Sequence, residues 1–103
     1  MVPRPHTVVQ RKLGAQERHV EAFAALGQLS RLQVFFFLVR KGEEVSAGEL
    51  ARALSIPGPT LSHHLETLRR SGLVQRRREG RFLYYRVEPT MVSDLTRLLT
   101  ACC

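Results

Sequence analysis

The feature that most constrains this chain is a four-residue turn between two short helical patterns. Ser46 and Glu49 have the spacing of a capping box, which predicts a short helix. Residues 55–58, Ser-Ile-Pro-Gly, are typical of a tight turn, and Pro59 is tolerated in the first turn of a second helix that reaches Ser71. Two short helices joined by so tight a turn predict a helix-turn-helix unit.

Two strand-like runs follow this unit at once. They cover residues 73–78 and 81–87, and Glu79-Gly80 between them suits a tight hairpin turn. Gly72 is well placed to end the preceding helix. The fold class we predict is therefore mainly α with a small β-hairpin, in which the hairpin forms the wing of a winged helix-turn-helix.

Two further helices are predicted ahead of this unit. The first, over residues 16–26, carries apolar side chains at helical spacing: Val20, Phe23, Ala24 and Leu26. The second is expected to begin at Ser30, which has capping-box spacing to Gln33, and to end at Gly42. Because residues 32–39 are continuously apolar, we expect this helix to be nearly enclosed.

One more helix is predicted after the hairpin. It begins at Pro89, and its apolar stripe is formed by Val92, Leu95, Leu98, Leu99 and Cys102. Residues 1–13 carry prolines and basic side chains without an apolar period, so we predict a basic N-terminal arm over residues 1–15 and one domain over residues 16–103. A domain this small is only marginally stable alone, which makes an oligomer plausible.

The charge of the chain points to a polyanion partner. Sixteen Lys and Arg against nine Asp and Glu give a net charge of +7, which favours nucleic acid over a membrane surface. Seven arginines lie between positions 69 and 86 against a single acid, Glu79, and would repel one another unless an anion were present. Because the guanidinium suits phosphate, we expect a clamp on the minor groove or the DNA backbone. The seven are Arg69, Arg70, Arg76, Arg77, Arg78, Arg81 and Arg86.

The second helix of the unit has the polar outer face of a recognition helix. With the stripe Leu61, Leu65 and Leu68 turned inward, His63 points outward and His64 lies nearer the core, where we expect a structural histidine with a local hydrogen bond. Short hydroxyls and an imidazole near the first turns suit a helix that enters a major groove. The candidate DNA-binding residues are Thr60, Ser62, His63, Arg69, Arg70, Arg76, Arg77, Arg78 and Arg81.

Several other classes of protein are disfavoured. The longest apolar run, residues 34–39, is far too short to span a bilayer, and the N-terminus lacks the apolar core of a signal peptide. We therefore expect a cytoplasmic protein whose cysteines are thiols. An enzyme is not expected, because no nucleophile–base pair or acid pair is found in a plausible pocket.

Several short motifs follow one another along the chain. They are Leu26-Gly27-Gln28-Leu29-Ser30-Arg31-Leu32, Gly48-Glu49-Leu50-Ala51, Thr60-Leu61-Ser62-His63-His64-Leu65, Leu68, Ser71-Gly72-Leu73-Val74, Arg78-Glu79-Gly80-Arg81 and Tyr84-Tyr85. In this order they resemble the ArsR-type family of bacterial winged-helix repressors, and the resemblance runs from about Val20 to Leu99. It implies a homodimer joined through the first and last helices, which occupies operator DNA and leaves it when a metal or metalloid binds.

Two metal sites that are common in this family are missing from the sequence. Arsenite and cadmium sensors of the family often carry Cys-Val-Cys where this chain reads Ser46-Ala47-Gly48. Its zinc and cobalt sensors use Asp and His on the last helix, where this chain has Asp94 but no histidine after His64. Pro57-Gly58 also departs from the family pattern, which leaves the operator sequence open.

The adjacent cysteines Cys102 and Cys103 are the remaining candidate ligands. A subgroup of arsenic-responsive members of the family bears a Cys-Cys pair at this end, and soft thiolates select soft ions. The expected inducer is arsenic(III) or antimony(III), and no other cofactor is expected to be required. A methylated arsenical needs two thiolates. Arsenite or antimonite needs a third, from a partner subunit, a small thiol or a cysteine beyond residue 103.

Two other functions and one structural interpretation remain open for the same residues. A repressor of the same fold could sense oxidant or reactive sulfur through these thiols. A constitutive DNA-binding protein would need no inducer. Cys102 could also merely extend the apolar stripe of the last helix, because a free cysteine behaves as a small hydrophobic residue.

Overall fold

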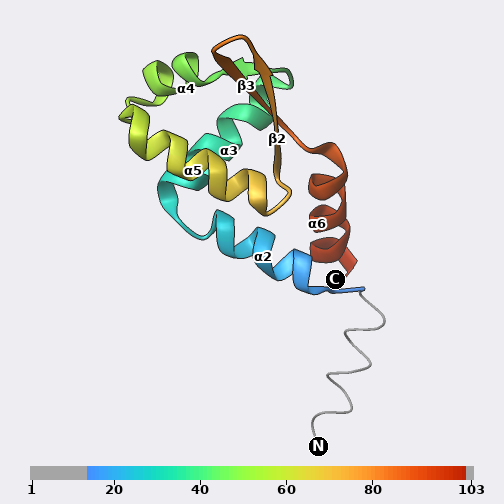
Figure 1. Ribbon diagram of the computed structural model, residues 1–103. Coiled ribbons are helices and arrows are strands. Elements are labelled where there is room, and N and C mark those ends of the chain that lie inside the picture. The colour runs from blue at the N-terminus through green and yellow to red at the C-terminus, as the bar shows by residue number, and fades with distance from the viewer. Residues whose placement is uncertain (1–13, 102–103) are drawn as a thin grey trace, which may run out of the picture.

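The computed structural model describes residues 14–101, and within them the chain is mainly helical with a small antiparallel sheet (Figure 1). Figure 1 shows α5 at the centre of the molecule and α6 at one side, with the last turn of α6 beside the start of α2. The predicted fold class, a winged helix-turn-helix, is confirmed. The elements follow in the order α2 (Glu17–Leu26), α3 (Leu29–Lys41), β1 (Val45–Ser46), α4 (Ala47–Leu54), α5 (Gly58–Arg70), β2 (Val74–Glu79), β3 (Phe82–Val87) and α6 (Pro89–Ala101).

Helix α3 differs from its prediction at its start and on one face. Its cap is Gln28, not Ser30, because Gln28 has an extended backbone and its side-chain oxygen accepts a hydrogen bond from the Arg31 N–H at 2.9 Å. Gly42 ends the helix in the left-handed conformation, as predicted. The expectation that α3 is nearly enclosed is wrong, since Phe36 is 56% exposed. In so small a domain only one face of the helix reaches the core.

Ser46 joins the sheet to the helix-turn-helix. Its hydroxyl accepts a hydrogen bond from the Glu49 N–H at 3.1 Å, which caps α4 as the sequence predicted. The same residue forms the end of β1, which pairs antiparallel with β3 through Val45 opposite Tyr85 and Ser46 opposite Tyr84. This strand was not predicted, because two residues are too few to show an alternating pattern.

The hairpin of β2 and β3 forms the wing. The strands pair from Val74 opposite Val87 to Glu79 opposite Phe82, and the sheet order is β1-β3-β2. The turn therefore lies at Gly80 and Arg81, one residue later than predicted, with Gly80 in a left-handed conformation at φ 64°. Along β2 only Val74 is buried, so the arginines of this strand face solvent.

The core confirms the stripe predicted for α5, because Leu61, Leu65 and Leu68 are buried in it. The apolar stripe of α2 lies elsewhere. Val20 is 58% exposed, while the buried residues of this helix are His19, Ala22 and Ala25. Together with exposed side chains on α3 and α6, this leaves apolar surface outside the core.

Across the described residues, no single helix has the length and hydropathy needed to cross a bilayer. Helices α2 and α3 meet these criteria only when counted together across a bend of 101°.

Candidate nucleic-acid interface

The first two turns of α5 present three of the predicted contact residues side by side. Thr60, Ser62 and His63 are all exposed, while Leu61 between them is buried and fixes the orientation of the helix. The helix begins at Gly58, directly after Pro57. The first backbone N–H groups of a helix lack intrahelical partners, so this end can donate to an anion.

The last turns of α5 hold a cluster of arginines around Glu66. Arg69 donates to both carboxylate oxygens of Glu66, from Nε at 3.0 Å and from Nη2 at 2.7 Å. Arg70 Nε donates at 3.0 Å, and Arg76 Nη1 of β2 lies 3.9 Å from Oε1. The bonds from Arg69 and Arg70 lower the pKa of Glu66 to about 2. The ion pairs of Glu66 with Arg69 and Arg70 could have been predicted from the sequence, because these residues have the i, i+3 and i, i+4 spacings of neighbours on a helix.

Arg77 lies in a second pairing on the wing. Its Nε and Nη2 donate to the two carboxylate oxygens of Glu44 at 2.7 and 2.9 Å, and its Nη1 donates to Glu79 at 3.0 Å. The guanidinium also lies 4.8 Å from the centre of the Tyr84 ring. The hydrogen bond from Arg77 holds the pKa of Glu44 below its usual value.

These pairings correct one sequence-based expectation. The seven arginines were set against the single acid Glu79, but Glu44 and Glu66 pair with them from other parts of the chain. Both acids lie outside the segment that was counted, and the fold brings them to it. Four of the seven arginines therefore lie beside carboxylates in the folded chain: Arg69, Arg70, Arg76 and Arg77.

The tip of the wing keeps two cations without such a partner. Within residues 14–101, neither Arg78 nor Arg81 lies within ion-pair distance of a carboxylate. Arg78 Nη1 donates to the Gly80 carbonyl at 3.4 Å, and the Arg81 guanidinium lies 5.8 Å from the centre of the Phe82 ring. These guanidinium groups are free to meet phosphate.

His64 lies where the sequence placed it, against the core, but within residues 14–101 a local hydrogen bond is not formed at its Nδ1. The residue is 6% exposed, and its Nδ1 has no partner among the described residues. Burial, with smaller contributions from Arg31 and His63, lowers its pKa, which favours the neutral ring. His64 is therefore part of the core, and the exposed imidazole on this helix is that of His63.

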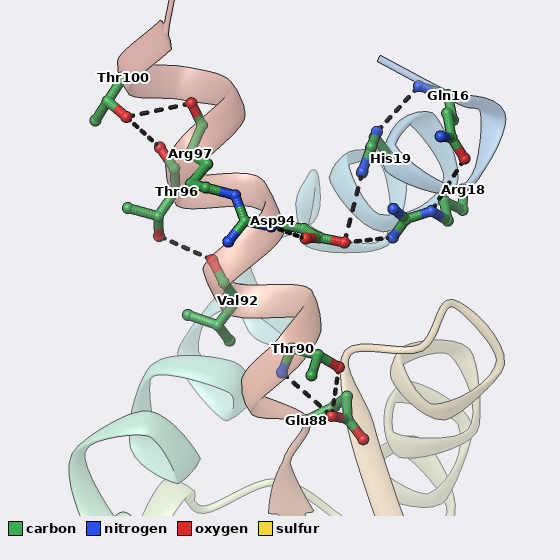
Figure 2. Close-up of polar contacts among 10 residues, drawn as sticks. All are labelled: Gln16, Arg18, His19, Glu88, Thr90, Val92, Asp94, Thr96, Arg97 and Thr100. Atoms are coloured by element: carbon green, nitrogen blue, oxygen red, sulfur yellow. Dashed lines mark hydrogen bonds and ion pairs between the residues drawn. The ribbon is translucent and has the colours of Figure 1, made fainter. Parts of the chain in front are cut away.

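A separate polar cluster joins α2 to α6 (Figure 2). Asp94 accepts hydrogen bonds from Arg18 Nη1 at 2.6 Å and from Arg97 Nη2, as Figure 2 shows. The buried His19 lies with Nε2 3.9 Å from Asp94 Oδ2, while its Nδ1 accepts a hydrogen bond from the Gln16 N–H at 3.0 Å. The hydrogen bond from Arg18 lowers the pKa of Asp94. These contacts tie the first described helix to the last.

The predicted metal ligands Cys102 and Cys103 lie outside the described residues. Within the part of the chain that the structure describes, no group of three His, Cys, Asp or Glu side chains is placed to hold a metal ion.

Comparison with known proteins places these features among transcriptional regulators. A helix-turn-helix domain family matches residues 26–77. The chain is 40% identical over 76 residues to the HTH-type transcriptional regulator KmtR of Mycobacterium tuberculosis, which covers 74% of this chain and 57% of that protein. It is 32% identical over 72 residues to the transcriptional repressor SdpR of Bacillus subtilis, covering 70% and 78%.

Two further similarities bear on function. The arsenic resistance transcriptional regulator ArsR1 of Pseudomonas putida is 36% identical over 67 residues, covering 65% of this chain and 52% of that protein. The chain thus spans just over half the length of KmtR and of ArsR1. Among solved structures, the homodimeric winged helix-turn-helix DNA-binding domain of Mb0332 from Mycobacterium bovis, a possible ArsR-family transcriptional regulator, has a TM-score of 0.68 and 30% identity, covering 84% and 78%.

Proposed function

The chain belongs to the ArsR-type family of winged helix-turn-helix transcriptional regulators, and from that premise we propose that it is a homodimeric repressor released from operator DNA by a trivalent arsenical. The family is one of DNA-binding regulators, so the chain regulates transcription and is not an enzyme. Its contacts with the operator, its action as a repressor and its inducer are proposed below.

The observation that carries the DNA-binding surface is the exposed start of α5 together with the two wing-tip cations that pair with no carboxylate among the described residues. The polar side chains Thr60, Ser62 and His63 enter the major groove, where His63 and Ser62 meet base edges or the adjoining phosphates. Arg78 and Arg81 contact phosphate or the minor groove. Further phosphate contacts come from the paired arginines, Arg69, Arg70, Arg76 and Arg77.

Replacing the two free wing-tip cations tests this surface. Arg78→Gln/Arg81→Gln is expected to weaken binding to every duplex and to flatten the dependence of log K on log salt by about two units, since each phosphate contact contributes about 0.9. The control Arg40→Gln removes a positive charge from α3, outside the proposed surface and the Asp94 contacts. A double variant whose salt slope equals that of the parent would show that the wing does not clamp phosphate.

The reading of bases requires a separate measurement. His63→Ala is expected to lower affinity for a duplex selected by the parent protein from a random pool by about 5- to 150-fold, the equivalent of about 1–3 kcal/mol for one base contact. Binding to unselected duplex should change little. Equal losses on the two DNAs would count against base readout by this histidine.

Repression by a homodimer is supported by two relatives and by exposed apolar side chains. SdpR is named a repressor, and the Mb0332 domain is homodimeric. Val20 and Phe23 of α2 and Leu99 of α6 are exposed on the two helices that the family resemblance assigns to the dimer. A two-fold dimer places two recognition helices about 34 Å apart, one helical turn of DNA.

The arsenical is proposed to bind the thiols of Cys102 and Cys103, which directly follow Ala101 at the end of α6. Support comes from the soft character of thiolate ligands and from the similarity to ArsR1. Drawing both sulfurs onto one metalloid would displace this end of α6, and the Asp94 contacts would carry that displacement to α2. A coupling of about 1–3 kcal/mol releases the operator 5- to 150-fold.

The inducer is identified by comparing arsenite, methylarsenite, zinc and peroxide in one operator-release assay. The parent is expected to respond to an arsenical and not to zinc, while Cys102→Ser/Cys103→Ser binds DNA normally and stays bound. A double-serine protein that still released its operator with either arsenical would end this assignment. Release by peroxide alone would identify a redox sensor, and release by none of the four would favour constitutive binding.

A further inference from the structure

Glu66 holds arginines from two elements, α5 and β2. Arg69 and Arg70 lie on the last turn of α5, whereas Arg76 lies on β2 of the wing. One carboxylate lies within 3.0 Å of the first two guanidinium groups and 3.9 Å from the third. The recognition helix and the wing are therefore joined by a shared anion.

The charge of this cluster is not balanced. Three guanidinium groups face one carboxylate, which leaves two positive charges in excess between α5 and β2. Arg77 is the opposite case, because one guanidinium faces the two carboxylates of Glu44 and Glu79. An external anion is thus attracted more strongly to the Glu66 cluster than to the pairing around Arg77.

The cluster is also open to a ligand. The side chain of Arg70 is 77% exposed, and those of Arg69 and Arg76 are partly exposed. A phosphodiester has two non-bridging oxygens and one negative charge, so it can accept hydrogen bonds from a guanidinium in the same way as the Glu66 carboxylate. Because a guanidinium has five N–H donors and Glu66 uses at most two of each, these arginines can bind Glu66 and a DNA phosphate at the same time.

We propose that Glu66 is an internal counterion that makes DNA binding selective, because it holds Arg69, Arg70 and Arg76 in one orientation that suits only a phosphate placed by the base contacts of α5. This inference rests on the proposed DNA-binding function. On random DNA the phosphates lie out of register with these oriented guanidinium groups and are repelled by Glu66, so the net gain is small. On the operator, contacts from the start of α5 place one phosphate beside the oriented guanidinium groups, and no contact with Glu66 has to be broken. Glu66 is thus a positioning residue for specificity.

Three variants separate this role from plain charge. Glu66→Gln removes the anion, while Glu66→Asp keeps the charge and withdraws the carboxylate by one methylene. Glu17→Gln removes the same charge from the first turn of α2 and serves as the matched control. Each protein is tested on a random-sequence duplex and on a duplex selected by the parent, over a salt titration, and its melting temperature checks the fold.

Glu66→Gln is expected to bind random duplex about tenfold more tightly and selected duplex less than threefold more tightly. The salt slope on random duplex should steepen by about one to two units, since each freed arginine adds about 0.9. Glu66→Asp should change in the same direction by a smaller amount, and Glu17→Gln should retain the selectivity of the parent.

An unchanged ratio of selected to random binding in Glu66→Gln would overturn the inference while leaving the proposed function intact. Equal effects of Glu66→Gln and Glu17→Gln would also overturn it, because net charge alone would then explain them. A parent that bound neither duplex would overturn the proposed function and this inference together.

Discussion

The Glu66 cluster and the Asp94 cluster use the same local arrangement in two different regions of the molecule. Each carboxylate accepts a hydrogen bond from an arginine three residues later, Arg69 or Arg97. Each also attracts an arginine of another element, Arg76 of β2 or Arg18 of α2. The same spacing thus gives a contact to the wing in one region and a contact between the first and last helices in the other.

What separates the two regions is the packing of the helices that carry them. Helix α5 contacts α2, α3, α4 and β2, and its inner leucines are fully enclosed. Helix α6 lies at one side of the molecule, and its buried residues are Met91 and Leu95 (Figure 1). The outer face of α5 is polar and basic, whereas α2 and α6 expose apolar side chains. One region therefore suits a polyanion, and the other suits a second protein surface.

The largest expected effect tests this difference in packing. Leu68→Ala should lower the free energy of unfolding by about 2–5 kcal/mol, because it leaves a cavity behind the Glu66 cluster. Leu95→Ala should cost less, since Leu95 lies on the less enclosed helix. Urea denaturation of both variants at one protein concentration provides the comparison. Equal losses would show that α6 is as firmly packed as α5.

The next effect tests the apolar region as a surface for a second copy. Phe23 is 37% exposed on α2, and covering such a side chain contributes about 1.5–3 kcal/mol. Phe23→Ser should therefore raise the dimer dissociation constant at least tenfold in sedimentation experiments. Phe82→Ser is the control, because Phe82 is 55% exposed on the wing and should leave the dimer unchanged. A dimer weakened equally by both variants would place the interface elsewhere.

A smaller effect concerns the joint between α5 and α6. Gly72 has φ +83°, and a Cβ atom added there would lie 3.2 Å from Met91 Cε of α6. Gly72→Ala should cost about 1–2 kcal/mol for the left-handed backbone, with an additional cost from the contact with Met91. Gly80→Ala isolates the backbone contribution, since at φ +64° its Cβ would meet nothing within 4 Å. Thermal melts in which Gly72→Ala is no worse than Gly80→Ala would show that Met91 moves aside freely.

The smallest effect is the dependence of stability on pH in the acid range. The folded-state pKa of Glu66 is about 2, below its usual value of 4.5, so its contribution is present above pH 4.5 and is lost as the pH falls toward 2. The melting temperature of the parent should fall through this window, and that of Glu66→Gln should fall less steeply. Asp94→Asn should show a similar flattening, because the pKa of Asp94 is also lowered. Parallel profiles for all three proteins would contradict the role of these carboxylates.

The sequence predicted those parts of the fold that depend on local pattern. Three features each depend on a sequence pattern only a few residues long, and the structure confirms them: the leucine stripe of α5, the Ser46 cap and the end of α3 at Gly42. The sequence did not predict the pairing of Glu44 with Arg77, because 33 residues separate them and only the folded sheet brings them together. The exposure of Val20 was equally hidden, since helical spacing does not say which face meets the core.

The candidate site divides along the same line. The outward position of His63 follows from the helix period and is confirmed, and Thr60 and Ser62 are exposed as well. Their contacts with DNA stay a prediction, as do the thiol ligands and the boundary drawn after residue 15. The pairs of Glu66 with Arg69 and Arg70 follow the helix spacing, but its contact with Arg76 depends on how the wing packs beside α5.

The double membership of Ser46, in β1 and in the cap of α4, has a consequence for how relatives of this chain can vary in length. Extra residues between Val45 and Ala47 would separate the cap from the strand, so that α4 and the wing would lose their common attachment. Extra residues around Gly42 and Glu43 lie outside both structures. Insertions and deletions among homologues should therefore accumulate ahead of Val45, where the loop can lengthen without turning the recognition helix relative to the wing.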